Sequence, residues 1–366
     1  MQGVGANCAR SNARHAMGIW ISALCWLLPA VPATPSQALG DHKPHVLGEG
    51  LPIGTKQAVA FGAHPSRLAC GMSTGDGGIV ALWDPTTAKL TKVLRGASGP
   101  ITSVAFSPNG GLLAASGAAK MFVAERVQRP IPGEVWVWDT ATGKLQRTLT
   151  GHKDWVRAVR FSPRGDLLAS ASWDKTVRMW DTKTWELMRT FSHPDEVSSI
   201  AFSPTGEILA SGCGSGSVLP GGAWRPKPGE IKIWHVGRWL PEGELVRTLR
   251  GHADDVIGLA FSPDGKTLAS ASAAGGAPVR IWDTSSWEPI TELRTDRPLS
   301  LAFSPKGELL AIAGGDALDL WDTQTWQVKA SLPAWGVSVS FSEDGKLLGA
   351  CDRAVVKLWD VSTESE

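Results

Sequence analysis

The sequence predicts an all-β protein built from small antiparallel sheets of four strands each. The stretch from residue 151 to residue 191 shows the pattern best, because VRAVRF, DLLASAS, TVRMW and ELMRTF are rich in β-branched and large apolar residues, as strands are. The turn-forming segments SPRG, SWDK and DTKT separate them. A four-stranded sheet of about 40 residues cannot bury both faces alone, so a chain of such units must stack them.

Two sequence marks divide most of the chain into seven such units. The first mark is a Trp followed by Asp or His, at Trp83-Asp84, Trp138-Asp139, Trp180-Asp181, Trp234-His235, Trp282-Asp283, Trp321-Asp322 and Trp359-Asp360. The second mark is a Phe that in six of the units opens an FSPxG or FSEDG turn, at Phe61, Phe106, Phe161, Phe202, Phe261, Phe303 and Phe341. Because the two marks recur in step, they indicate one repeated structural unit.

These marks resemble those of the WD-repeat family, whose units form the blades of a β-propeller, and the resemblance covers roughly residues 45 to 361. It implies a seven-bladed propeller in which the seven marker tryptophans are core residues. The resemblance also implies a hydrogen-bonded tetrad that locks a blade, and the matching residues here are His152, Ser170, Asp174 and Trp180. The tetrad is complete only in the third unit. The fifth keeps the pair Gly251-His252 but lacks the Asp, and the other units lack the Gly-His pair.

The first 38 residues have the composition of a targeting segment. Residues 1 to 15 contain Arg10 and Arg14 and no acid, and residues 16 to 31 form an apolar run that is shorter than the ~20 residues of a membrane span. We therefore predict a signal peptide over residues 1–38, cleaved after Ala33 or Ala38, and an exported protein, periplasmic or extracellular. An uncleaved membrane anchor is the alternative. Cleavage after either site changes the formal charge from +1 to −1 by removing two arginines, and a near-neutral chain argues against a nucleic-acid partner.

The remaining chain is predicted to be one closed propeller, residues 39–361, followed by a tail, residues 362–366. The seventh Trp-Asp pair is followed only by VSTESE, which is too short for a fourth strand. Residues 45 to 50 (HVLGEG) are the natural donor of that strand, and their pairing would close the ring and remove an exposed sheet edge.

The cysteines and histidines do not indicate a metal site, and a disulfide is the less favoured interpretation of the cysteines. Cys70, Cys213 and Cys351 would remain after cleavage, and we expect buried thiols, with a Cys70–Cys351 disulfide as the less favoured alternative. The only close histidine pair is His42 and His45, so no metal site is predicted.

Two insertions depart from the repeat. The spacing from Phe to Trp is 19 residues in the third unit but 32 in the second and fourth, and both long segments end in RPxPGE, at residues 129–134 and 225–230. Both insertions fall between the second and third strands. Proline limits the entropy lost on ordering, so we expect semi-rigid projections.

The resemblance places these insertions on the top face of the propeller, on either side of the third unit, with a binding groove between them. Tryptophan and arginine are frequent interface anchors, so the candidate partner-binding residues are Trp155, Trp173, Trp335, Phe122, Arg126, Arg129, Trp224, Arg225 and Lys227. The alternative is that the tryptophans only cap the channel and the insertions only lengthen the blade. On the opposite face Trp185, Trp239, Trp287 and Trp326 are expected to brace turns, with a second binding face as the alternative.

No catalytic pattern is present, because the sequence has no nucleophile elbow, phosphate-binding loop or zinc motif. We therefore predict a non-enzymatic, monomeric scaffold that needs no cofactor and binds a protein or peptide on the top face near units two to four. The alternatives are an enzyme or small-ligand binder at the central top opening, and a purely structural element.

Overall fold

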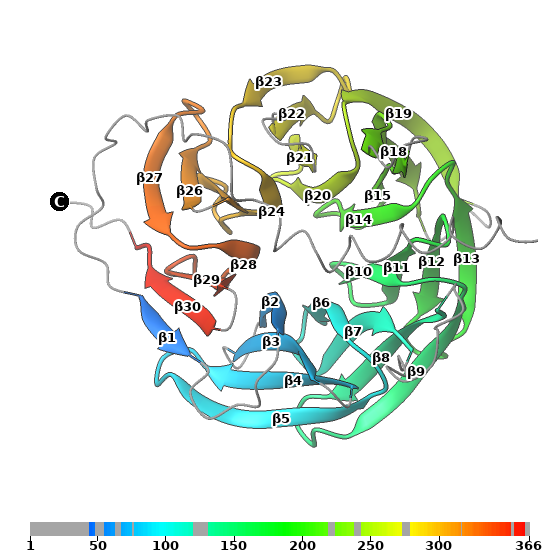
Figure 1. Ribbon diagram of the computed structural model, residues 1–366, viewed down its shortest axis with the longest axis vertical. Coiled ribbons are helices and arrows are strands. Elements are labelled where there is room, and N and C mark those ends of the chain that lie inside the picture. Colours follow the sequence, from blue (N-terminus) through cyan, green and yellow to red (C-terminus); the bar gives the residue numbers. More distant parts are fainter. Residues whose placement is uncertain are drawn as a thin grey trace, which may run out of the picture.

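The computed structural model of the protein describes residues 44–47, 55–62, 67–74, 77–119, 131–218, 224–237, 243–272, 279–315, 317–352 and 355–362. Within them, seven four-stranded antiparallel sheets are arranged radially around a central opening, as Figure 1 shows. The prediction of a seven-bladed β-propeller is therefore confirmed. None of the described residues forms a helix long and apolar enough to cross a membrane.

The first six blades follow the chain order, with the first strand of each innermost. Blade 1 comprises β2 (Thr55–Gly62), β3 (Arg67–Thr74), β4 (Gly77–Asp84) and β5 (Lys89–Ala97). Blade 2 comprises β6 (Ile101–Phe106), β7 (Leu112–Ala118), β8 (Gly133–Asp139) and β9 (Leu145–His152). Blade 3 comprises β10 (Val156–Phe161), β11 (Leu167–Ser172), β12 (Thr176–Asp181) and β13 (Leu187–Ser192).

The second half of the ring repeats this order with one addition. Blade 4 comprises β14 (Val197–Phe202), β15 (Ile208–Cys213), β18 (Gly229–His235) and β19 (Glu244–His252), and a separate hairpin of β16 (Gly216–Val218) and β17 (Trp224–Pro226) is inserted in it. Blade 5 comprises β20 (Val256–Phe261), β21 (Thr267–Ser272), β22 (Val279–Asp283) and β23 (Pro289–Leu293). Blade 6 comprises β24 (Pro298–Phe303), β25 (Leu309–Gly314), β26 (Ala317–Asp322) and β27 (Val328–Pro333).

Blade 7 is completed by the N-terminal strand, as predicted. It consists of β28 (Gly336–Phe341), β29 (Leu347–Asp352), β30 (Val355–Asp360) and β1 (His45–Leu47). β1 pairs antiparallel with β30, with His45 opposite Leu358, and the two strands lie side by side in Figure 1. This pairing joins the two ends of the chain within one sheet and closes the ring.

The repeated FSPxG turn connects the first strand of a blade to the second. In blade 3, Gly165 has φ of 74° and its N–H donates to the Ser162 carbonyl at 2.8 Å. The Ser162 hydroxyl accepts a hydrogen bond from Leu167 N–H at 3.0 Å. Glycine takes this left-handed conformation without steric cost, which explains why the sequence mark ends in Gly.

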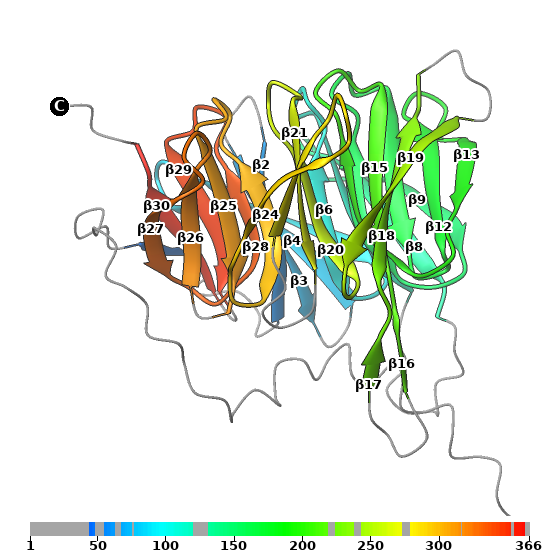
Figure 2. The same cartoon turned by 90° about the horizontal axis from the view of Figure 1, so that it is seen from above.

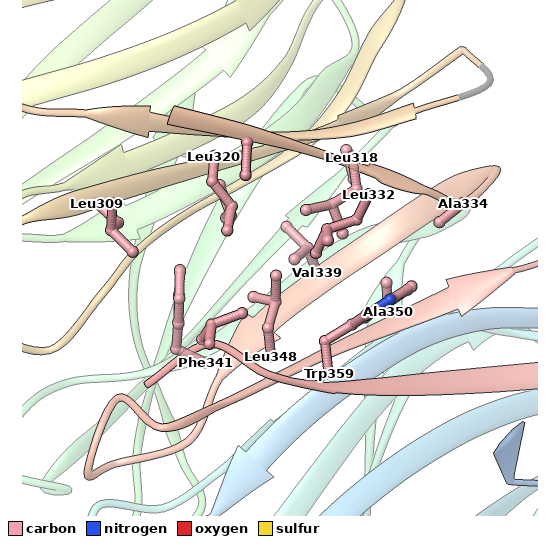
Figure 3. Packing of buried hydrophobic residues seen from close by; sticks show 14 residues of the cluster. Leu309, Leu318, Leu320, Leu332, Ala334, Val339, Phe341, Leu348, Ala350 and Trp359 are labelled. Atoms are coloured by element: carbon pink, nitrogen blue, oxygen red, sulfur yellow. The ribbon is translucent and has the colours of Figure 1, made fainter. Parts of the chain in front are cut away.

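The hydrophobic core lies between neighbouring blades. Figure 3 shows one such layer, in which Leu318, Leu320 and Leu332 of blade 6 pack against Leu348 and Trp359 of blade 7. All seven marker tryptophans are buried, with exposed fractions between 0% for Trp138 and 8% for Trp234 and Trp321. Packing between blades therefore supplies the main stabilisation, as expected for a sheet that cannot bury its faces alone.

The three described cysteines are buried and form no disulfide. Cys70 and Cys351 belong to the same cluster between blades 7 and 1, together with Met72 and Trp83. They therefore act as small apolar residues in the core, as the sequence suggested.

Candidate functional site

The top face is the edge of the disc at which each blade begins its first strand. Antiparallel strands alternate in direction, so the loops that lead into a blade and the loops between its second and third strands emerge at this same edge. The β16–β17 hairpin lies between β15 and β18 and therefore marks this face, which points downward in Figure 2. The other two turns of each blade lie on the opposite, bottom face.

Blade 3 contains the predicted tetrad. The Trp180 Nε1–H donates to Ser170 Oγ at 3.0 Å, and the same hydroxyl lies 2.8 Å from His152 Nε2. His152 Nδ1 lies 2.8 Å from Asp174 Oδ2. Indole can only donate and ionised carboxylate can only accept, so His152 donates from Nδ1 and accepts the Ser170 proton at Nε2.

This arrangement shifts two pKa values. Burial lowers the pKa of His152 against the opposing effect of Asp174. Burial alone would raise the pKa of Asp174, but hydrogen bonds from His152 and Thr176 and the charge interaction with His152 lower it far below its usual range. The carboxylate is therefore ionised and the imidazole is neutral at ordinary pH.

Blades 4 and 5 contain the same lock without the carboxylate. His193 Nε2 lies 2.7 Å from Ser211 Oγ, which also accepts from Trp234 Nε1 at 2.8 Å. In blade 5 the equivalent residues are His252, Ser270 and Trp282. The expectation that a blade without a Gly-His pair lacks the lock is wrong for blade 4, because His193 follows Ser192 rather than Gly. The constant spacing of 18 residues from His to Ser would have revealed it.

The inserted hairpin of blade 4 projects from the top face, as Figure 2 shows. Asp195 holds its base, since Oδ1 accepts from Ser215 Oγ at 2.6 Å and Oδ2 lies 3.6 Å from Lys227 Nζ. The same carboxylate lies 3.6 Å from Lys175 Nζ of blade 3. Trp224 and Arg225 belong to β17, opposite Val218 and Ser217 of β16. The expected projection is thus anchored to two blades.

Residues 120–130 of the other predicted insertion, in blade 2, lie outside the described residues, and so do its candidates Phe122, Arg126 and Arg129. The chain on both sides of that segment is held together, because Ala119 N–H donates to the Pro132 carbonyl at 2.8 Å. This pairing places both ends of the insertion at the edge of blade 2, next to blade 3.

Trp155 and Trp173 are brought together. Their rings are stacked with centroids 6.1 Å apart. Trp155 is only 8% exposed and packs with Ala118 and Ile131 of blade 2, whereas Trp173 is half-buried. Trp155 therefore forms the buried member of the pair, and Trp173 presents an aromatic surface to the solvent. Trp335 is half-buried before β28 and is not part of this pair.

A ring of bulged residues was not recognised in the sequence. In every blade the pairing of the first two strands shifts register at the residue four positions before the marker Phe. β-bulges re-aim a side chain at such a position. The described side chains are Thr102, Arg157, Ser198, Ile257, Leu299 and Val337, and all are half-buried on the innermost strands. The fixed distance from the Phe could have identified them.

Polar bulge residues of blades 3 and 4 contact the top-face loops. The Arg157 guanidinium lies 5.1 Å from the Trp173 ring centroid, and Trp173 Nε1–H donates to Ser198 Oγ at 3.4 Å. Ser198 Oγ in turn donates to Asp255 Oδ2 at 2.7 Å. These contacts join blades 3, 4 and 5 in one polar cluster at the top of the central opening.

On the bottom face, Trp185, Trp287 and Trp326 occupy turns with φ of 64°, 60° and 54°. Each is half-buried and packs against the cluster between its own blade and the preceding one. These contacts agree with the bracing role, while Trp239 lies outside the described residues. Among the residues that the structure describes, no group of three or more His, Cys, Asp or Glu side chains could hold a metal ion.

Comparisons with known proteins identify the repeats. The family model "WD domain, G-beta repeat" matches residues 88–121, 143–181, 185–219 and 243–277. The chain is 31% identical to the nuclear distribution protein PAC1 of Arthroderma otae over 220 residues, which are 56% of this chain and 45% of that protein. It is 30% identical to periodic tryptophan protein 2 of Arabidopsis thaliana over 236 residues, 64% of this chain and 23% of that protein. The chain thus spans less than half the length of these relatives.

The predicted export is wrong by the same comparisons. Besides the nuclear distribution protein, the relatives include pre-mRNA-processing factor 19 homolog 2 of Arabidopsis thaliana, at 28% identity over 53% of this chain and 42% of that protein. These names point away from an exported protein. The prediction rested on a short apolar run that follows a segment with two arginines and no acid, and this pattern alone does not separate a signal from other apolar segments. The proposed signal segment, residues 1–38, lies outside the described residues.

Proposed function

We propose that this seven-bladed propeller with WD40 repeats is a non-enzymatic scaffold that binds a protein or peptide partner on its top face, beside blades 2 to 4. The supporting observation is the half-buried Trp173, which stacks on the more deeply buried Trp155 and lies next to a hairpin anchored by Asp195. A large aromatic side chain with a fixed position loses little entropy on binding and buries much area. Binding needs no cofactor.

The relatives support a binding role in a limited way. They share the WD40 repeats with this chain, and none of the quoted names states a catalysed reaction. Exposed loops on a rigid scaffold commonly carry recognition. The propeller supplies such a scaffold, and the inserted hairpin and the Trp pair give its top face a surface of its own.

The proposed contact residues are the candidates that the sequence predicted. Trp173 is the central contact, Trp155 supports it, and Lys227 stands at the base of the hairpin that carries Trp224 and Arg225. Phe122, Arg126 and Arg129 belong to the neighbouring insertion, and Trp335 to the far side of the opening. Its last sheet is completed by its own N-terminal strand, so closure of the ring needs no second copy, and we expect the propeller to act as a monomer.

Quantitative affinity capture tests this function with a control on the opposite face of the same blade. The wild-type protein, W173A and W185G are used to capture partners from cells that contain the protein. Trp173 and Trp185 are both half-buried residues of blade 3, but they lie on opposite faces. We expect W173A to lose at least about tenfold of the captured partner, as for an interface anchor, and W185G to retain it. Equal capture by W173A and wild type would contradict the proposal.

A further inference from the structure

Arg160 reaches solvent from the innermost strand of blade 3. It is the last residue but one of β10, which runs from the top face to the bottom face, so it lies near the bottom end of the central opening. Its side chain is exposed, although Val159 and Phe161 on either side of it are buried. The innermost strands surround the central opening in Figure 1. The guanidinium is therefore accessible to a solute in that opening.

The equivalent position of the other blades carries a small side chain. This position directly precedes the marker Phe, and its other occupants are Ala60, Ala105, Ala201, Ala260, Ala302 and Ser340. All six are buried or half-buried, and the Ser340 hydroxyl accepts a hydrogen bond from Phe61 N–H at 3.2 Å. Arg160 is therefore the one long polar side chain in this ring of residues.

Hydrogen bonds hold one side of the guanidinium and leave its other side open. Arg160 Nη1 donates to Ser103 Oγ of blade 2 at 3.1 Å and to the Val159 carbonyl at 2.8 Å. Within the described part of the chain, no hydrogen bond uses Nε or Nη2 of Arg160. These two nitrogens form one edge of the guanidinium, whose two parallel N–H donors match two oxygens of an oxyanion.

The charge of Arg160 lacks a counter-ion among the described residues. Although the side chain is exposed to the opening, the protein around the opening desolvates it and lowers its pKa, and no described carboxylate acts in the opposite direction. Arg157 on the same strand differs, because the charges of Asp255 and Glu196 act to raise its pKa. None of the ion pairs between described residues includes Arg160. A desolvated cation without a counter-ion costs free energy, which an anion bound beside it would offset.

We propose that Arg160 forms a binding site for a small oxyanion at the bottom end of the central opening. The Nε–H and Nη2–H groups donate two parallel, charge-assisted hydrogen bonds to two oxygens of a phosphate or carboxylate group. The bonds to Ser103 and Val159 hold the guanidinium before the anion enters, so little side-chain entropy is lost on binding. The site lies at the opposite end of β10 from the Trp155–Trp173 pair, and the inference does not depend on the proposed function.

The rest of the ring explains why the ligand is small. Alanine side chains cannot bond the polar parts of a larger ligand, such as a sugar, and burial of those parts without partners costs free energy. A single phosphate or carboxylate group finds both of its donors on the free edge of Arg160. A chloride ion offers one atom instead of two oxygens, so it does not match that edge.

Calorimetric titration of the full chain with phosphate, acetate and chloride tests the site. Ionic strength is kept constant, because salt screens the charge of an exposed group. We expect a dissociation constant of about 1 mM for the tighter of the two oxyanions, within the reach of two charge-assisted hydrogen bonds, and no saturable binding of chloride. Phosphate and acetate together show which oxyanion group fits better. Absence of saturable binding by both oxyanions at about 20 mM would overturn the proposal.

Three variants examine the role of the guanidinium edge. R160Q removes the charge and the edge, and should weaken oxyanion binding at least about tenfold. R160K keeps the charge but loses the planar pair of donors, and should weaken it at least about threefold. R147Q is the matched control, because Arg147 Nη1 also donates to the preceding carbonyl at 2.8 Å, but its exposed side chain lies on the outer strand β9. R147Q should bind as wild type does, and equal binding by R160Q and wild type would overturn the proposal.

Thermal unfolding supplies a second measurement that starts from the wild-type protein. A ligand that binds only the folded state raises Tm, and we expect a rise of at least about 2 °C in 20 mM of the tighter oxyanion relative to chloride at equal ionic strength. R160Q reports the general effect of the salt on stability and should show a smaller rise. An equal rise in wild type and R160Q would contradict binding at Arg160.

Discussion

Blades 3 to 5 and blades 6, 7 and 1 share one fold but are held together differently. In blades 3, 4 and 5 the marker tryptophan donates to a serine that a buried histidine also contacts. In blades 6, 7 and 1 the indole Nε1 of Trp321, Trp359 and Trp83 is buried without a partner. At the marker tryptophan, hydrogen bonding thus locks blades 3 to 5, whereas blades 6, 7 and 1 have no such bond.

The difference follows from one position on the second strand. This position pairs with the first-strand residue that lies two before the marker Phe. Blade 3 has Ser170 there, whereas blades 1, 6 and 7 have Cys70, Ile312 and Ala350. These residues offer the indole no strong acceptor, but they pack in the clusters between blades. Each missing hydrogen bond forgoes ~1 kcal/mol. The proposed binding face lies on the locked side, where loops are held by side-chain contacts as well as by packing.

Acidification should weaken the locked side most strongly. Burial lowers the pKa of both His193 and His252 to about 4 from an ordinary value of 6.5, so the unfolded chain binds more protons between these values. Stability is therefore lost as pH falls from 6.5 towards 4, on the order of 2 kcal/mol for each histidine at pH 5. Asp174, whose pKa is lowered, contributes its stability throughout this range and loses it only below pH ~4.

Urea unfolding at pH 7 and pH 5 measures this effect. The variant H193Q/H252Q, which lacks both titrating groups, is the control and should show a smaller difference between the two pH values. A wild-type free energy of unfolding that is the same at pH 7 and pH 5 would refute the protonation argument.

Removal of the shared serine should be the most damaging single substitution in the lock. S170A leaves both His152 Nε2 and Trp180 Nε1 without a partner in a buried site, and we expect a loss of about 3 kcal/mol. S116A in blade 2 is the matched control, because Ser116 is also fully buried on a second strand but bonds only Thr102. Its expected loss is about 1 kcal/mol. Equal losses of unfolding free energy for S170A and S116A, in thermal or urea unfolding, would contradict the claim that Ser170 satisfies two buried groups.

The glycine before the histidine should matter in blade 3 but not in blade 4. Gly151 has φ of 115°, and a Cβ at this position would collide with the Arg178 guanidinium. We expect G151A to cost about 2 kcal/mol through backbone strain and displacement of that arginine. S192A at the equivalent position of blade 4 should change the free energy of unfolding by less than about 0.5 kcal/mol. A neutral G151A would show that the glycine is dispensable.

Repair of an unlocked blade should give the smallest effect, a gain. A350S places a hydroxyl in the register that Ser170 occupies in blade 3, where it can accept from Trp359 Nε1. The expected increase in the free energy of unfolding is below about 1 kcal/mol, because the new hydrogen bond is partly offset by burial of the hydroxyl. The same change in blade 2, A115S, should give no gain, since Trp138 already donates to the Arg95 carbonyl at 2.8 Å.

The sequence predicted those features that depend on repetition. The count of seven blades, closure by residues around His45 and the buried marker tryptophans all follow from spacing and from the missing last strand. The lock at His193 was missed because the prediction relied on a preceding glycine, although only the histidine side chain reaches the serine. The ring of bulged residues was missed because a bulge changes side-chain direction without changing residue type.

The candidate site was only partly predictable. Trp155 and Trp173 were singled out as binding candidates, and the structure stacks them, but their unequal exposure depends on the packing of Ala118 and Ile131 against Trp155. Asp255 was not singled out from the sequence, and only its contact with Ser198 and its buried oxygen distinguish it.

Hydrogen exchange of the propeller, free and bound to its captured partner, tests the proposed face most directly. Mass spectrometry follows backbone amides around residues 153–157, 173–176, 195–198 and 214–218 on the top face and around residues 182–188 on the bottom face. We predict slower exchange in the top-face segments on binding and no change at the bottom. Protection confined to the bottom turns, or to blades 6, 7 and 1, would contradict the account.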